Sequence, residues 1–261
     1  VKWIGTNVGL VKNDGDNWTS FNTKNSKIPT NRITSIVVDK NNDKWIGTCG
    51  GGIVKLNEKG DFEIYNKTNS PLKSNYILSL YVDNNNSLYV GTNNGFAIYS
   101  NNNWSIIDSS DSNLVDRFVF SIAQEDNGAI WLGQSTGVVK LFNGIYSKYI
   151  FKNYNIKLST VKAIDIDSLG NKWLGTNTTG LVKFDNTNWT VYNQSNSGLP
   201  NNAIQDVFID KNGSIWVATD LQGIAVLDNQ NWVVFNRSNS NIPSNTITSI
   251  AVDNQNNKWF T

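Results

Sequence analysis

Residues 161–192 read VKAIDIDSLGNKWLGTNTTGLVKFDNTNWTVY, and this stretch contains every element of a pattern that runs through the chain. An aromatic residue follows Lys172 at its centre, and a glycine and an acid keep fixed distances from that aromatic residue. Three markers in phase indicate an internal repeat of about 43 residues. The aromatic positions are Trp3, Trp45, Tyr89, Trp131, Trp173, Trp216 and Trp259, the glycines are Gly9, Gly52, Gly95, Gly137, Gly180 and Gly223, and the acids are Asp39, Asp83, Glu125, Asp167, Asp210 and Asp253.

One period contains four short apolar or alternating segments, which predict four β-strands. In the first complete period these strands are expected at residues 33–38, 44–48, 53–56 and 62–65. A polar stretch, Asp39 to Asp43, separates the first two and is suited to a hairpin turn, because Asp and Asn side chains bond to nearby backbone groups.

Four antiparallel strands per repeat, without a helical period, predict an all-β fold. A single small sheet cannot bury both faces, whereas repeated sheets stacked against one another can. We therefore expect a β-propeller of four-stranded antiparallel blades, with the Trp, Tyr and Phe residues packed between blades. The whole chain, residues 1–261, is expected to form one propeller domain.

The pattern I-x-S-I-x-x-D-x-x-G-x-x-W-[IL]-G-T-x-x-G-[LI]-x-x-[FL]-D-x-x-x-W-x-x-Y resembles the two-component-regulator propeller repeat. Residues 161–192 and 204–235 match it best, and the resemblance covers essentially the entire chain. It implies a β-propeller that is usually extracytoplasmic and often forms the sensor region of bacterial membrane histidine kinases. In characterised relatives from gut bacteria, such sensors respond to polysaccharide fragments.

The number of blades follows from counting the expected strands. Five blades are complete in sequence, at residues 33–66, 77–108, 119–150, 161–193 and 204–236. A sixth blade is expected to combine residues 247–252 with residues 10–13 and 18–21, so that strands from both termini close the ring. One second-strand segment, 2–6 or 258–261, is then in excess. Six blades are therefore predicted, with seven in a longer parent protein as the alternative.

Composition excludes several classes of site. The chain has no His, one Cys and a net charge of +1. Imidazole chemistry, a disulfide framework and a cysteine-based zinc site are therefore excluded, and no cofactor or metal is expected. Nucleic acids and anionic membranes require a basic field that this chain lacks. No apolar run approaches the 18 residues of a membrane-spanning helix, so no membrane segment is expected in this chain.

Because structural residues repeat, side chains that break the repeat are the candidates for function. On two successive first strands, at positions that are mostly apolar or hydroxylic in other blades, lie Lys162, Asp165, Gln205 and Asp206. These residues are interpreted either as a ligand or ion site near the propeller axis or as a structural ion pair, for instance between Lys162 and Asp206.

A second candidate lies just before the first strands of three blades. The residues there are Arg32, Tyr76, Arg117 and Phe118. Guanidinium groups bind carboxylates and aromatic rings stack on sugars, so this rim could bind an acidic sugar; ordinary loop packing is the alternative. The D-x-N turns lack the ligand set of a calcium loop and are expected to be hairpin turns. Cys49 is expected to be a free thiol.

Three functions are consistent with these features. The first is a non-catalytic, extracytoplasmic sensor or binding module for oligosaccharides or another small polar ligand. The second is a structural or protein-interaction scaffold of a bacterial cell-surface or secreted protein. The third, a polysaccharide lyase or glycosidase, would need Asp165 and Asp206 as its carboxylate pair, and propeller lyases of this kind depend on His. Because the chain starts at Val1, we expect an excised or processed part of a larger bacterial protein.

Overall fold

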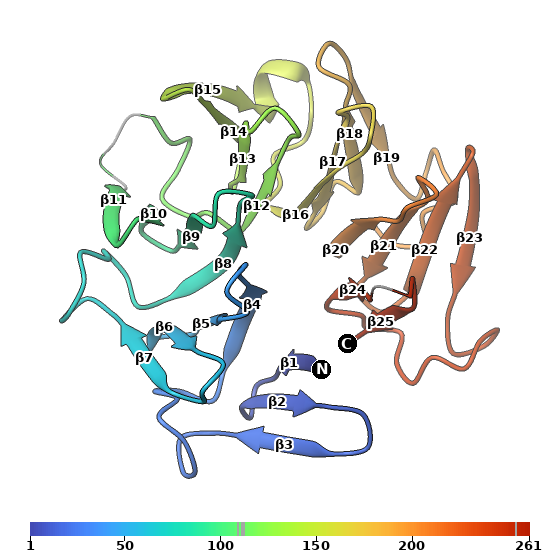
Figure 1. Ribbon diagram of the computed structural model, residues 1–261. Coiled ribbons are helices and arrows are strands. Elements are labelled where there is room, and N and C mark those ends of the chain that lie inside the picture. Colours follow the sequence, from blue (N-terminus) through green and yellow to red (C-terminus); the bar gives the residue numbers. More distant parts are fainter. Residues whose placement is uncertain (109, 111–112, 254) are drawn as a thin grey trace. The chain divides into compact units, whose positions relative to one another are not determined.

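The computed structural model describes residues 1–108, 110, 113–253 and 255–261. The chain divides into two compact units, Val1–Ile122 and Ala123–Thr261. Strands dominate in both units (Figure 1), and the described part of the chain contains one short 3₁₀ helix, η1 (Phe151–Tyr154). The all-β prediction is therefore confirmed, and η1 is a local addition that the repeat did not predict.

The first unit contains a three-stranded sheet followed by two four-stranded sheets, all antiparallel. The strands of the first sheet are β1 (Lys2–Gly5), β2 (Leu10–Asn13) and β3 (Trp18–Phe21). The next sheet comprises β4 (Ile33–Val38), β5 (Lys44–Thr48), β6 (Gly52–Leu56) and β7 (Phe62–Tyr65), and the third comprises β8 (Ile77–Val82), β9 (Leu88–Thr92), β10 (Gly95–Ser100) and β11 (Asn103–Ile107).

The second unit contains the remaining sheets, and β12 (Ser121–Gln124) crosses the boundary between the units. The sheet that begins with β12 continues, in order, with β13 (Ile130–Gly133), β14 (Gly137–Phe142) and β15 (Ile145–Ile150). Two further four-stranded sheets follow. The first comprises β16 (Val161–Ile166), β17 (Lys172–Thr176), β18 (Leu181–Phe184) and β19 (Trp189–Tyr192). The second comprises β20 (Ile204–Ile209), β21 (Ile215–Thr219), β22 (Gly223–Asp228) and β23 (Asn231–Phe235). The last sheet pairs β24 (Ile250–Val252) with β25 (Lys258–Phe260).

The fold is the predicted β-propeller of four-stranded antiparallel blades, and the five complete blades occupy the predicted segments. The terminal sheets together contain one first strand, two second strands, one third and one fourth strand. This is the complement of a sixth blade with one second strand in excess, as expected. The joining of the two terminal sheets into one blade stays a prediction.

The first strand deviates from a regular ladder near its start in four of the five complete blades. The register shifts between Ile33 and Ser35 in β4, and the same shift occurs in β8, β16 and β20. Such a bulge places one extra residue on the strand and changes the direction of its side chains. In β16 and β20 the extra residues are Lys162 and Gln205, two of the predicted site residues.

The hydrophobic core within each unit lies between successive blades. In the first unit, Trp45 of β5 packs with Leu80 and Val90 of the following blade. In the second unit, Trp173 of β17 packs with Val207 and Val217 of the following blade. Burial of these apolar faces drives the stacking of the sheets. The predicted packing of aromatic side chains between blades is confirmed.

Candidate functional site

The acid of every repeat is bonded to the aromatic residue six positions later. In the best-matching repeat, Asp167 accepts a hydrogen bond from the indole N–H of Trp173 at 2.9 Å. The equivalent pairs are Trp45–Asp39 (2.9 Å), Tyr89–Asp83 (3.1 Å), Trp131–Glu125 (2.7 Å), Trp216–Asp210 (3.0 Å) and Trp259–Asp253 (3.0 Å). A mostly buried indole needs such an acceptor, so these acids have a structural role.

The same acids hold the hairpin turns. The second carboxylate oxygen of Asp39 accepts the backbone N–H groups of Asn41 and Asp43 at 2.9 and 3.0 Å. This is the Asx-type bonding expected of the turn, and the predicted hairpin turns are confirmed. Across the residues that the structure describes, no three acidic, Cys or His side chains are grouped so that they could hold a metal ion.

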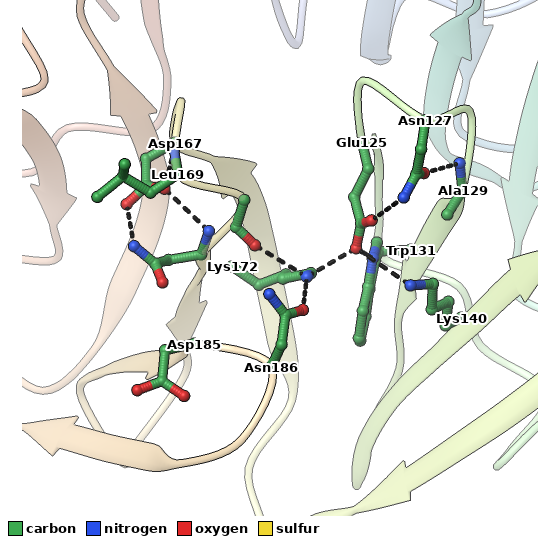
Figure 2. A network of polar contacts seen from close by, with 12 residues as sticks. Glu125, Asn127, Ala129, Trp131, Lys140, Asp167, Leu169, Lys172, Asp185 and Asn186 are labelled. Atoms are coloured by element: carbon green, nitrogen blue, oxygen red, sulfur yellow. Dashed lines mark hydrogen bonds and ion pairs between the residues drawn. The ribbon is translucent and has the colours of Figure 1, made fainter.

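A buried ion pair connects two successive blades of the second unit (Figure 2). The Nζ of Lys172 on β17 lies 2.6 Å from Oε1 of Glu125, which follows β12. Lys172 also donates to the carbonyl of Gly170 at 2.9 Å and to Asn186. Because its side chain is only 1% exposed, the ammonium depends on these acceptors.

Glu125 is in turn surrounded by donors. Its carboxylate accepts hydrogen bonds from Trp131 at 2.7 Å and from Asn127 at 2.8 Å, and Lys140 lies 3.4 Å away. Burial alone would raise the pKa of Glu125, but the hydrogen bonds from Lys172, Trp131 and Asn127 outweigh it and hold the pKa below its usual range. The network in Figure 2 therefore fastens one blade to the next.

The two predicted aspartates lie on neighbouring inner strands of the second unit, and each bonds to the strand that follows. Asp165 of β16 accepts the backbone N–H of Ile209 at 2.6 Å. Asp206 of β20 accepts the N–H of Ile250 at 2.8 Å and the hydroxyl of Ser249 at 3.1 Å. Each carboxylate thus satisfies edge N–H groups that a ladder does not use. Both carboxylates therefore have a structural role.

Burial changes the acidity of both aspartates. Desolvation raises the pKa of Asp165 to about 6, against the opposing effect of its bonds from Ile209 and Ile166. Desolvation likewise raises the pKa of Asp206 to about 6, against its bonds from Ile250, Val207 and Ser249. These carboxyls therefore take up protons at mildly acidic pH.

The predicted ion pair between Lys162 and Asp206 is wrong. Within the described ranges, Lys162 forms no ion pair, and Asp206 is bonded to backbone and hydroxyl donors instead. The physical reason is that Asp206 has nearer partners on the next strand, whereas Lys162 is a half-exposed bulge residue that water can solvate. Gln205 is the corresponding bulge residue of β20.

The predicted rim residues lie in the first unit. The Arg117 guanidinium lies 4.7 Å from the ring centroid of Phe118, and Phe118 stacks on Phe120 at 5.5 Å. Arg117 is exposed and, in the described part of the chain, has no acidic partner. This cation–π stack holds the guanidinium in place while its N–H groups face solvent.

Arg32 and Tyr76 are linked through the loop that carries Cys49. The carbonyl of Arg32 accepts the N–H of Cys49 at 3.0 Å, and Cys49 forms a β-bridge with Tyr76. Arg32 is exposed and Tyr76 is 51% exposed. Cys49 is a free thiol, as expected. The structure therefore places one stack at Arg117 and one exposed pair beside Cys49.

A groove that sequence reasoning missed lies between two blades of the second unit. It has a volume of about 520 Å³ and is lined by Trp173, Lys183, Tyr192, Asn196, Ser197, Ile215, Leu227, Asn229, Gln230 and Trp232. At the third-strand position of Leu227 the complete blades carry Leu56, Tyr99, Leu141, Phe184 and Leu227, so the repeat pattern gave no signal for this groove.

Two segments of the chain, residues 71–94 and 198–220, match the family model described as two component regulator propeller. These two segments carry two-component regulator propeller repeats. The matched segments contain β8–β9 and β20–β21, which are the first two strands and the acid–aromatic hairpin of a blade. The resemblance inferred from the repeat pattern is thereby confirmed.

Solved structures show the same fold. The chain is similar to the extracellular domain of a hybrid two component system from B. thetaiotaomicron, with 26% identity and a TM-score of 0.84 over 99% of this chain and 36% of that chain. A second extracellular domain of a hybrid two component system from that organism shares 17% identity, with a TM-score of 0.62 over 99% of this chain and 47% of that chain. The chain thus spans less than half the length of each of these two domains.

Propellers of a different function share the fold as well. A catalytically inactive variant of virginiamycin B lyase from Staphylococcus aureus, in which a histidine is replaced by alanine, is 15% identical, with a TM-score of 0.74 over 88% of this chain and 77% of that chain. This likeness concerns the fold alone. No curated protein matches the chain. In the described residues, no helix is long and apolar enough to cross a membrane.

Proposed function

We propose that the chain is a non-catalytic, ligand-binding propeller of an extracytoplasmic bacterial sensor, and that its ligand is an oligosaccharide. The observation that carries the proposal is the 26% identity to the extracellular domain of a hybrid two component system, which extends over 99% of the chain. Two matches to the two component regulator propeller model support the same assignment.

The rim of the first unit supplies one group of ligand contacts in this proposal. The guanidinium of Arg117 rests on Phe118 and is exposed without an acidic partner among the described residues. A preorganised guanidinium loses little side-chain freedom when it binds a carboxylate or sugar hydroxyls. Arg32 and the exposed ring of Tyr76 offer a second guanidinium and an aromatic face.

The inner strands of the second unit offer a separate candidate site by themselves. Lys162 and Gln205 occupy the bulges of β16 and β20, where side chains leave the regular ladder. We assign them direct polar contacts with ligand. Asp165 and Asp206 would fix the strands that carry them, because their carboxylates bond to the backbone of the next strand.

A thermal-shift screen with neutral and acidic oligosaccharides tests the proposal. A ligand at 100 times its Kd adds about 2.7 kcal/mol to the free energy of unfolding, which raises the Tm by several degrees for a chain of this size. The shift should be lost in Arg117→Ala if the rim binds the ligand, or in Lys162→Ala if the inner strands bind it, and kept in Arg237→Ala, which removes an exposed arginine elsewhere. If no member of the panel raises the Tm, the proposal fails and the scaffold function is favoured.

A further inference from the structure

The groove between β17–β19 and β21–β23 lies beside a third-strand position that carries a leucine in three of the five complete blades (Leu56, Leu141 and Leu227) and an aromatic ring in the other two. At the third-strand position of Leu227, β10 has Tyr99 and β18 has Phe184. The ring of Tyr99 packs 5.6 Å from Trp45, and that of Phe184 packs 6.0 Å from Trp131. Leu227 lacks a ring, and the space beside the tryptophan of the preceding blade becomes a groove of about 520 Å³, a volume typical of small-molecule sites.

A cation in the same groove has lost its usual partner. Lysines at the position of Lys183 are paired in two other complete blades, Lys55 with Asp43 at 2.9 Å and Lys140 with Glu125 at 3.4 Å. In this blade, Asn171 occupies the position of Asp43. Within the ranges that the structure describes, Lys183 has no ion pair and lies 5.2 Å from the ring centroid of Trp173.

The acids closest to Lys183 in sequence and in the repeat are engaged elsewhere. Asp167 bonds to Trp173 and Asn171. Asp185 is exposed and accepts the backbone N–H groups of Asn188 and Thr187 at 2.6 and 3.0 Å; these bonds, and more weakly the charge of Lys183, lower its pKa. The ammonium therefore remains available to an anion from outside the chain.

The walls of the groove combine aromatic faces with free polar groups. The rings of Tyr192 and Trp232 lie 6.2 Å apart, and Tyr192 stacks on Trp173 at 5.9 Å. The indole N–H of Trp232 and the amide of Gln230 have no hydrogen-bond partner among the described residues, although both groups line the groove. Gly198 allows the close approach of Trp232 in the wall of the groove, because a Cβ at position 198 would lie 2.4 Å from the Cβ of Trp232.

We propose that this groove binds an acidic sugar residue, a uronate, of an oligosaccharide. The aromatic rings of Trp232 and Tyr192 contact the apolar face of the pyranose ring, Lys183 pairs with its carboxylate, and Gln230 and the indole N–H bond to its hydroxyls. The inference rests on the proposed function, and adds to it a site on the second unit that is distinct from the bulges of β16 and β20.

Titration calorimetry with trigalacturonate and with its methyl ester tests this inference, because the ester keeps the sugar rings and hydroxyls but replaces each carboxylate by an uncharged methyl ester. The acid should bind at least tenfold more tightly than the ester. Leu227→Tyr fills the groove with the residue that the chain itself uses at Tyr99, and Lys183→Gln removes the charge; each should weaken binding at least tenfold. Lys55→Gln, at the equivalent position of another blade, should leave the affinity unchanged.

Cooperative unfolding at the wild-type Tm must be established for each variant, and Trp232→Leu replaces Leu227→Tyr if the latter does not fold. The groove assignment would be overturned by any of three results: the acid and the ester bind equally tightly, the groove variants bind the acid as tightly as the unmodified chain does, or neither probe binds. Benzoate that binds as tightly as the uronate would assign the groove to aromatic carboxylates and overturn the sugar. An acidic oligosaccharide whose binding is lost in Arg117→Ala but kept in Leu227→Tyr and Lys183→Gln would overturn the groove while supporting the proposed function.

Discussion

The indole N–H of Trp173 lies 2.9 Å from the carboxylate of Asp167, and the equivalent bond joins the aromatic residue and the acid in five other repeats. The bond ties the second strand of a blade to the turn that precedes it. It also lets a large indole enter the core without leaving a buried donor unsatisfied. The repeated acid and aromatic residue, the most regular feature of the sequence, thus stabilise the fold and carry no information about the ligand.

Replacing one of these acids should destabilise the chain strongly. Asp39→Ala removes the acceptor of the Trp45 indole and of two turn N–H groups, all at a buried residue. We expect a loss of about 2–4 kcal/mol in the free energy of unfolding, measured by urea denaturation. Asp14→Ala, which removes a surface partner of Lys12, should cost less than about 1 kcal/mol. Equal losses in the two variants would contradict the structural role of Asp39.

The Lys172–Glu125 pair should show strong energetic coupling. Lys172→Met leaves the Glu125 carboxylate without its 2.6 Å partner and should cost about 3 kcal/mol. Glu125→Gln leaves the buried ammonium with neutral acceptors and should also destabilise. A double-mutant cycle should show that the two losses are not additive, with a coupling of about 1–3 kcal/mol. Additive losses would mean that the two side chains act independently.

The stability of the chain should be greatest at mildly acidic pH. Because the native state raises the pKa of Asp165 and Asp206 to about 6, it holds these protons more tightly than the unfolded chain does. Their contribution is complete below the ordinary pKa of 3.8 and is lost as the pH rises through about 6. Each group should change the free energy of unfolding by about 1–3 kcal/mol.

The lowered pKa of Glu125 acts in the opposite direction. Its contribution is present above the ordinary value of 4.5 and is lost as the pH falls through its lowered native value. Urea denaturation between pH 3 and 8 should therefore give a maximum between about pH 4 and 4.5 and a decline from there to about pH 7. Asp206→Asn should flatten the decline on the alkaline side. A stability that rises steadily from pH 5 to 8 would contradict the raised pKa of the two inner aspartates.

Two glycines in the same blade should respond differently to alanine. Gly180 has a φ of +102°, and an added Cβ would lie 2.1 Å from the carbonyl oxygen of Tyr192. Gly170 has a φ of +76°, but an added Cβ would meet nothing within 4 Å. Gly180→Ala should cost about 2–4 kcal/mol and Gly170→Ala about 1 kcal/mol, both measured by thermal unfolding. Similar Tm values for the two variants would show that the close approach at Gly180 can relax.

The fold was predictable because its determinants repeat. The strand bounds 33–38, 44–48 and 62–65 agree with β4, β5 and β7, since hairpin acids and glycines mark the ends of strands. The last inner strand, expected over 247–252, is regular only over Ile250–Val252. The helix η1 was not predicted, because a single 3₁₀ turn has no sequence period.

The candidate site was less predictable, because partners depend on three-dimensional distances. The charges of Lys162 and Asp206 suggested a pair, yet Asp206 satisfies the backbone of the next strand. The groove beside Lys183 depends on the absence of a ring at Leu227, and its volume appears only when two blades are stacked. Because Leu56 and Leu141 occupy the equivalent position in two other blades, a comparison of the repeats does not single out Leu227.

The central claim is that repeated residues maintain the fold while residues that break the repeat bind ligand. The most direct test uses the oligosaccharide that gives the largest rise in Tm in the thermal-shift screen. Its affinity for Asp39→Ala and for Arg117→Ala is measured by calorimetry at a temperature at which both variants are folded. We predict a lowered Tm with unchanged Kd for Asp39→Ala, and an unchanged Tm with at least tenfold weaker binding for Arg117→Ala. Unchanged binding in Arg117→Ala, together with weakened binding in Asp39→Ala, would contradict the account.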